Sequence, residues 1–211
     1  MIFDFGSVIY RTDWDGADRR FYEKQGFHIR ISDVKDVRLR EELERIYAGS
    51  DTGKFDLKDL MLKLKPDVAD INGAIRDYKE AYSKSKVASK GMLKIIGELR
   101  KSGMMLFGFS DVKMEHHDAN KRAGIYDGFE KVFTSYGFGS TKADASSFGR
   151  LARELERYAS KPNECIFVDD KEQNIENARA LGFRVIHYTD FPSTERFEVQ
   201  LRKLLSDARR A

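Results

Sequence analysis

The sequence predicts an α/β fold: a three-layer, open parallel sheet (Rossmannoid) with a small all-helical insert after its first strand. Short apolar runs alternate with amphipathic helical segments over residues 87–211, which is typical of parallel β-α-β units. The stretch from about residue 14 to residue 86 breaks this alternation and shows helical periodicity alone. We therefore expect a core domain of residues 1–13 and 87–211 and a helical cap domain of residues 14–86.

Short apolar runs mark the strands of the expected sheet. They are Ile2–Phe5, Met104–Phe109, Lys131–Thr134, Cys165–Val168 and Arg184–His187. Cys165 is the only cysteine of the chain, so no internal disulfide can form, and its apolar neighbours predict a buried thiol.

Apolar residues at helical spacing predict the helices. In the core these residues lie within Gly91–Lys101, Phe148–Tyr158, Ile175–Leu181 and Phe197–Leu205, and in the insert within Leu39–Tyr47, Leu57–Leu64 and Ile71–Tyr82. Asp56 stands where an N-cap would begin the second helix of the insert, and Gly182 follows the third core helix as a C-terminal stop.

The bulk properties exclude several classes of protein. The chain has 211 residues, of which 41% are hydrophobic and 35% charged, and no apolar run approaches the ~20 residues of a membrane span. The net charge is +3 and the basic residues are scattered, so we expect no nucleic-acid partner. The first strand reaches Asp4 without a signal-peptide pattern, which favours a cytoplasmic protein. Nothing in the sequence indicates the oligomeric state.

Polar residues stand where the expected strands end. Asp4 lies near the end of the first strand. Ser110-Asp111 follows the second strand and Asp169-Asp170 the fourth, while Lys142 lies in the loop after the third. In open α/β sheets, ligands bind beyond the carboxyl ends of the strands. Carboxylates that converge there repel one another unless a cation intervenes, and a hard cation such as Mg²⁺ satisfies oxygen ligands of this kind.

Each of these residues also has a structural explanation of its own. Asp4 could cap a strand end, Ser110 could cap the following helix, and Lys142 could be a solvated surface lysine. The pair Asp169-Asp170 could complement the dipole of the next helix. The occurrence of all of them at one expected sheet edge favours a shared site.

Four segments resemble the motifs of the haloacid dehalogenase-like (HAD) superfamily of hydrolases. Ile2–Ile9 resembles the first motif, Leu106–Asp111 the second, Thr141–Phe148 the third and Ile166–Ala178, the most specific match, the fourth. They run in the family's order, and the insert falls where its helical-cap members place their cap. The Asp-x-Gly-x-Val form of the first motif resembles that of one phosphatase-type branch.

The resemblance implies a phosphatase of small phosphorylated metabolites with the strand order 3-2-1-4-5. In such an enzyme Asp4 would attack phosphorus and form an aspartyl-phosphate. Lys142 would act with it, and Ser110, Asp111 and Lys142 would contact the phosphoryl group.

The resemblance also implies a Mg²⁺ cofactor. Its ligands would be Asp4, the main-chain carbonyl of Gly6 and a carboxylate of Asp169 or Asp170. Asn174 would orient the metal-binding loop.

Gly6 departs from the family pattern. Most family phosphatases carry there a second aspartate, which protonates the leaving group and later activates water. Such a group typically contributes ~10²–10⁴ in rate. Asp13 and Asp15 are candidate replacements, although capping of the next helix explains both. Aryl or acyl phosphates would need the missing acid least.

Two other functions stay open. A haloacid dehalogenase also lacks the second aspartate. It needs no metal, however, and the pair Asp169-Asp170 facing Asp4 favours a bound metal ion. A non-catalytic module that binds a phosphorylated ligand or a partner would also be compatible with Gly6.

A few further residues have two explanations each. Tyr10, Trp14 and Phe21 could line a substrate pocket or serve in packing. Arg11 could contact an anion or lie at the surface. The adjacent pair His116-His117 makes a poor chelate, and a solvated helix is the better interpretation.

Overall fold

The computed structural model describes residues 1–208 and contains a five-stranded parallel sheet of order β5-β4-β1-β6-β7. In chain order this is 3-2-1-4-5, so the expected topology is confirmed, although three strands differ in length or position from the expected runs. The strands are β1 (Ile2–Phe3), β4 (Phe107–Ser110), β5 (Lys131–Thr134), β6 (Ile166–Asp169) and β7 (Arg184–His187).

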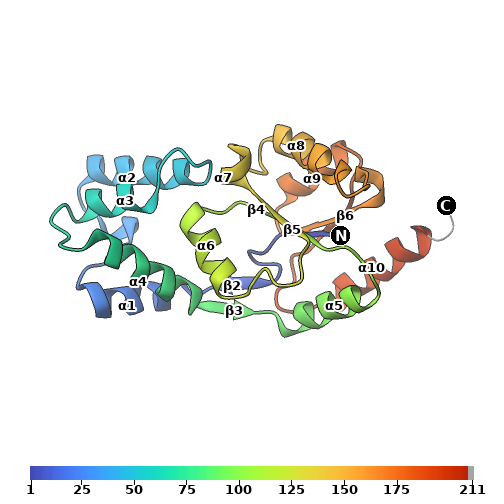
Figure 1. Cartoon of the computed structure of the whole chain (residues 1–211), viewed down its shortest axis with the longest axis horizontal. Coiled ribbons are helices and arrows are strands. Elements are labelled where there is room, and N and C mark those ends of the chain that lie inside the picture. Colours follow the sequence, from blue (N-terminus) through green and yellow to red (C-terminus); the bar gives the residue numbers. More distant parts are fainter. Residues whose placement is uncertain (209–211) are drawn as a thin grey trace.

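Helices cover both faces of this sheet (Figure 1). Successive side chains of a strand point to opposite faces. Ile2 packs in one apolar cluster with Phe148, and Phe3 packs in the other with Ile96 and Phe197. The first face is covered by α8 (Ala145–Glu156) and α9 (Glu172–Ala180), and the second by α5 (Lys90–Lys101) and α10 (Glu195–Ala208). The three layers follow from this alternation.

Between β1 and β4 the chain builds a bundle of α1 (Trp14–Gln25), α2 (Val37–Ser50), α3 (Leu57–Leu64) and α4 (Ile71–Ser83). The bundle has an apolar cluster of its own, which includes Phe21, Leu43 and Met61. Each of its helices begins after an aspartate whose carboxylate accepts a backbone N–H three residues on. These N-caps are Asp13, Asp36, Asp56 and Asp70. The expected cap at Asp56 is confirmed.

A two-stranded antiparallel ribbon joins the bundle to the sheet. It consists of β2 (Tyr10–Thr12) and β3 (Lys86–Ala88), with Thr12 opposite Lys86. Neither strand was predicted from the sequence, because three residues of which none is buried are too few to show a clear apolar period. The ribbon is important for the site, since it places Lys86 beside the main sheet's ligand-binding edge.

Helix α6 (Met114–Arg122) lies between the bundle and the sheet (Figure 1). Glu115 accepts a hydrogen bond from the Leu57 amide at 3.1 Å, and Lys79 pairs with Asp118 at 3.0 Å. The bundle is therefore docked on α6 through polar contacts. Within residues 1–208, none of the helices combines the length and the apolar character that crossing a membrane requires.

Candidate active site

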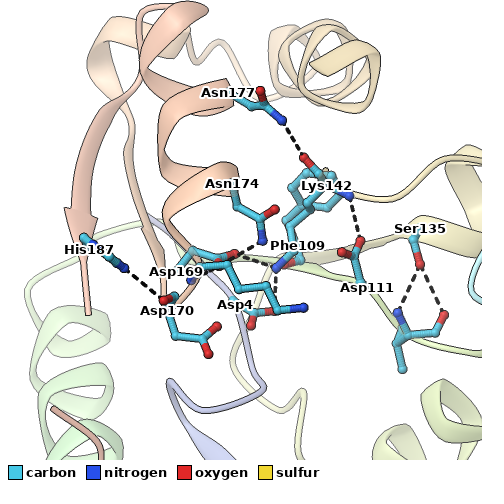
Figure 2. A network of polar contacts seen from close by, with 12 residues as sticks. Asp4, Phe109, Asp111, Ser135, Lys142, Asp169, Asp170, Asn174, Asn177 and His187 are labelled. Atoms are coloured by element: carbon cyan, nitrogen blue, oxygen red, sulfur yellow. Dashed lines mark hydrogen bonds and ion pairs between the residues drawn. The ribbon is translucent and has the colours of Figure 1, made fainter. Parts of the chain in front are cut away.

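The polar residues expected at the strand ends lie at one edge of the sheet, and Figure 2 shows Asp4, Asp111, Asp169 and Asp170 around Lys142. Asp4 directly follows β1, Ser110 ends β4 and Asp169 ends β6, which are three adjacent strands of the sheet. Lys142 reaches the same point from the loop between α7 (Ser135–Phe138) and α8. The sheet order brings Asp4, Ser110 and Asp169 together, since β1 lies between β4 and β6.

Lys142 is the central cation of the site. Its Nζ lies 2.7 Å from Asp4 Oδ1 and 2.6 Å from Asp169 Oδ2, and it donates to the Phe109 carbonyl at 3.2 Å. The side chain is 2% exposed, so it is not the surface lysine of the structural explanation. Burial by itself lowers the pKa of Lys142, but Asp4 and Asp169 outweigh it and raise that pKa above the ordinary value. The lysine is therefore protonated.

Hydrogen bonds hold the two ends of this ion-pair network. Asp111 Oδ1 accepts from the Lys142 amide at 2.9 Å, which fixes the loop that carries the lysine. Asn174 and the Lys171 amide both donate to Asp169 Oδ1, each at 2.9 Å. Asn174 thus fixes Asp169, while its expected role in orienting a metal-binding loop stays a prediction. The structure shows this structural role of Asp111, and the contact with a phosphoryl group that the sequence predicted for it stays a prediction.

Three carboxylates could hold a cation here. Oxygens of Asp4, Asp169 and Asp170 lie within 4.8 Å of one another. Burial, with the charges of Asp169 and Asp170, raises the pKa of the Asp4 carboxyl, although Lys142 opposes the shift. Lys142 contacts Asp4 and Asp169, and this ammonium together with the three carboxylates has a formal charge of minus two. An all-oxygen donor set with this charge fits a hard divalent cation such as Mg²⁺.

The turn after Asp4 brings Gly6 to the open side of the site. Ser7 has φ 54°, a conformation that costs a non-glycine residue roughly 1–2 kcal/mol, and its amide donates to the Tyr10 carbonyl at 2.8 Å. Gly6 itself is outside the left-handed region, and a Cβ there would stand 3.7 Å from Asp4 Oδ2. Since that is ordinary van der Waals contact, there is space for a Cβ, and a clash at that atom does not explain the glycine.

A cavity of about 650 Å³ opens above these residues. Asp4, Gly6, Ser110, Asp111, Lys142 and Asp170 line it, as do Tyr10, Arg11 and Trp14. Phe21 belongs instead to the bundle's apolar cluster. Asp13 caps α1 through the Gly16 amide at 3.0 Å, and Asp15 pairs with Arg30. Neither aspartate lines the cavity, so the structure supports capping and surface roles for them, not replacement of the missing acid.

The interpretation of His116 as part of a solvated helix is wrong. His116 is buried, because helix α4 of the bundle packs on α6 and its Tyr78 and Tyr82 rings lie against the imidazole. Its ring stacks on Tyr82 with centroids 3.9 Å apart, and its Nε2 lies 2.9 Å from the Tyr78 hydroxyl. Burial, with a contribution from Lys113 and Lys86, lowers the pKa of His116 well below its ordinary value.

This burial predicts a pH-dependent stability. As pH falls below ~6.5, the unfolded chain protonates His116 while the folded protein does not, so stability is lost in that direction. Between about pH 7 and pH 5 the wild type should lose up to about 2 kcal/mol more than His116→Gln. Urea unfolding of both proteins across this range measures the difference. Parallel stability curves would contradict a buried neutral His116.

The wall of the cavity opposite the strand ends was missed by the sequence analysis. It is formed by Tyr47, Tyr82, Lys86, Lys113 and His116. Lys113 pairs with Asp51 at 2.6 Å and stands over the Tyr47 ring at 3.6 Å. These residues come from the bundle, the ribbon and the start of α6. No motif signals them, because only the docking of the bundle on α6 brings them together.

The comparisons with known proteins agree with this geometry. The model of the haloacid dehalogenase-like hydrolase family matches residues 1–182. The chain therefore belongs to the haloacid dehalogenase-like hydrolases, and it is an enzyme of that family. This membership does not support the non-catalytic alternative.

One curated relative and two solved structures are informative. The sesquiterpene phosphatase astK of Aspergillus oryzae is 27% identical over 104 residues, which is 49% of this chain and 52% of the relative. This chain thus matches about half the length of that protein. A HAD family enzyme of Bacteroides thetaiotaomicron, solved in complex with magnesium and inorganic phosphate, has a TM-score of 0.70 at 17% identity, over 93% of this chain and 96% of that one.

A 2-haloacid dehalogenase of Pseudomonas syringae has a TM-score of 0.66 at 18% identity, over 100% of this chain and 98% of that one. At such identities the likeness to both structures shows the fold. Because the fold carries both a dehalogenase and an enzyme that binds magnesium and phosphate, the reaction must be argued from the site.

Proposed function

We propose that this hydrolase is a Mg²⁺-dependent phosphatase that forms an aspartyl-phosphate at Asp4. The observation that carries the proposal is the position of Asp4: a buried carboxylate in contact with Lys142 and within 4.8 Å of carboxylate oxygens of Asp169 and Asp170. A halide leaves without a proton or a metal. A cluster of three carboxylates therefore supports phosphoryl transfer over dehalogenation.

In the proposed reaction, a carboxylate oxygen of Asp4 attacks the phosphorus of a phosphate monoester, and the bond to the leaving oxygen breaks. Lys142 stabilises the charge that develops on the phosphoryl oxygens, and the Ser110 hydroxyl donates to one of them. Water then hydrolyses the acyl phosphate, which releases inorganic phosphate and restores the Asp4 carboxylate.

Mg²⁺ would be held by Asp4, the Gly6 carbonyl and a carboxylate of Asp169 or Asp170. Bound there, it would neutralise phosphoryl charge as a Lewis acid. Asn174 and the Lys171 amide support this role, since they fix Asp169 by its Oδ1 and so hold the carboxylate in place.

The α1–α4 bundle is proposed to be the cap over this site, a domain of about residues 14–86. Tyr47 and Tyr82 of the bundle line the cavity together with Asp4 and Lys142 of the core. A cap in this position would exclude water from the phosphoryl group and select the organic part of the substrate.

Turnover of simple phosphates tests the proposal. With p-nitrophenyl phosphate and acetyl phosphate, we expect release of phosphate that requires Mg²⁺ and stops on chelation with EDTA. Both substrates have good leaving groups, so they bypass the acid that Gly6 lacks. Absence of turnover with both, together with halide release from a 2-haloacid, would replace the phosphatase by a dehalogenase.

Gly6→Asp should restore general-acid catalysis. The new carboxyl would stand next to Asp4, where space for a Cβ exists. We expect turnover of alkyl phosphates to rise about tenfold or more, and that of p-nitrophenyl phosphate to change much less, because only the alkoxide needs a proton. Gly6→Asn is the matched control, since asparagine has nearly the same size as aspartate but no acidic group. Equal effects on the two substrates would contradict this role.

A further inference from the structure

Lys86 stands out among the residues of the cavity wall. It belongs to β3, and its Nζ lies 2.9 Å from the Thr12 hydroxyl oxygen and 2.5 Å from the Tyr82 hydroxyl oxygen. The same nitrogen stands 3.8 Å above the centroid of the Tyr82 ring. The Lys86 ammonium is thus held in one place at the cavity wall by two hydroxyls and a ring face.

This ammonium has no counter-charge. Lys142 pairs with Asp4 and Asp169, and Lys113 pairs with Asp51. Within residues 1–208, no carboxylate lies close enough to Lys86 to form an ion pair. Burial lowers the pKa of Lys86 to about 7, and no neighbouring carboxylate offsets that shift. Lys86 is half-buried. A cation partly withdrawn from water without a counter-charge is costly, and an anion supplied from outside the chain would reduce this cost.

The aromatic residues around Lys86 indicate which part of a ligand would lie between such an anion and a phosphoryl group. Tyr82 stacks on the neutral His116 and stands 5.6 Å from the ring of Trp14. Trp14 and Tyr82 line the same cavity as Asp4 and Asp170, and neither of these two carboxylates is in contact with Lys86. The Lys86 ammonium is therefore separate from the carboxylates of the cavity, and the rings of Trp14 and Tyr82 lie beside it.

We propose that Lys86 binds a second anionic group of the substrate, so that the substrate of this site carries a phosphate monoester at one end and a carboxylate or second phosphate at the other. The organic part between them packs against Trp14 and Tyr82. The proposal rests on the phosphatase function in assigning the first phosphate to the Asp4 end of the cavity. Lys86 is in this account a specificity-determining residue.

Binding of phosphonates, which are not hydrolysed, tests the proposal without turnover. Calorimetry with the full chain and Mg²⁺ compares n-alkylphosphonates with ω-carboxyalkylphosphonates and alkane-α,ω-bisphosphonates of matched lengths. We expect one chain length at which the second anion tightens binding by about 10–100-fold, the effect of one charge-assisted hydrogen bond. The carboxylate and bisphosphonate series show which anion the site prefers.

Lys86→Met should abolish the preference for the second anion, and Lys86→Arg should keep most of it. Lys90→Met is the matched control, because Lys90 is an exposed lysine at the start of α5, outside the cavity. It should bind all ligands as the wild type does. Thermal melting curves establish that each variant is folded.

Equal affinities of the wild type for mono- and dianionic ligands at every length would overturn the proposal. A preference that survives in Lys86→Met would overturn it too. Failure of the phosphatase function is a separate result: p-nitrophenyl phosphate would then not be hydrolysed, while the preference for the second anion and its loss in Lys86→Met could still be measured.

Discussion

Asp4→Asn should lower kcat/KM for acetyl phosphate by on the order of 10⁴-fold or more, since it removes the nucleophile itself. Asparagine has nearly the same shape, and its amide oxygen can still accept from Lys142, which contacts Asp4 Oδ1 at 2.7 Å. The fold should therefore be kept, and the loss should fall on kcat. Steady-state phosphate release at saturating Mg²⁺ measures the effect.

The matched control is Asp15→Asn. Asp15 is an exposed aspartate that pairs with Arg30 and does not line the cavity, so its loss should change turnover little. Turnover by Asp4→Asn within tenfold of the wild type would show that the reaction does not pass through this carboxylate.

Lys142→Met should have the second large effect, on both activity and stability. It removes the only ammonium in contact with Asp4 and Asp169 within the described chain, residues 1–208. Stripping one partner from buried carboxylates costs about 3–5 kcal/mol, and the loss of phosphoryl charge stabilisation should lower kcat by on the order of 10²–10³-fold. Urea unfolding in EDTA and phosphate release give the two values.

Added Mg²⁺ should restore part of the lost stability of Lys142→Met, because the cation supplies a new counter-charge to the same carboxylates. Lys131→Met is the control, since Lys131 is an exposed lysine at the start of β5. Unfolding of Lys142→Met and the wild type at the same urea concentration in EDTA would contradict a stabilising role of the ion pairs of Lys142.

Much of the core could be predicted from the sequence because its signals are local. Apolar runs separated by amphipathic helices indicate a parallel sheet, and polar residues directly after those runs must then lie at one edge. Asp4, Ser110 and Asp169 are therefore predictable from position in the chain. Lys142 is harder, since its loop shows no period. It was included because this loop follows the third strand, and the resemblance to the family's third motif supported that choice.

The far wall of the cavity could not be predicted, for a physical reason. His116 is polar and lies on a helix with little apolar character, which is typical of a solvated helix. It is buried because the bundle docks on α6, and that docking depends on contacts between segments far apart in the chain, such as Tyr78 with His116. Lys86 was missed for the same reason, since its strand is recognisable only by its pairing with β2.

Gly6 illustrates the limit of sequence reasoning in another way. The sequence shows that the second aspartate is missing, and the structure adds that the glycine is not required by backbone conformation or by space. An enzyme without this acid and base should form the acyl phosphate readily from substrates with good leaving groups and hydrolyse it slowly.

Because formation of the acyl phosphate would be faster than its hydrolysis, phosphorylated Asp4 should accumulate, and its detection is the most direct test. The wild type, mixed with acetyl phosphate and Mg²⁺ and quenched in acid during turnover, should carry a phosphoryl group on the tryptic peptide Met1–Arg11. The group should be removed by hydroxylamine, as an acyl phosphate is, and should be absent from Asp4→Asn. Phosphate release without any adduct on this peptide, at times from the first turnover onward, would contradict the account.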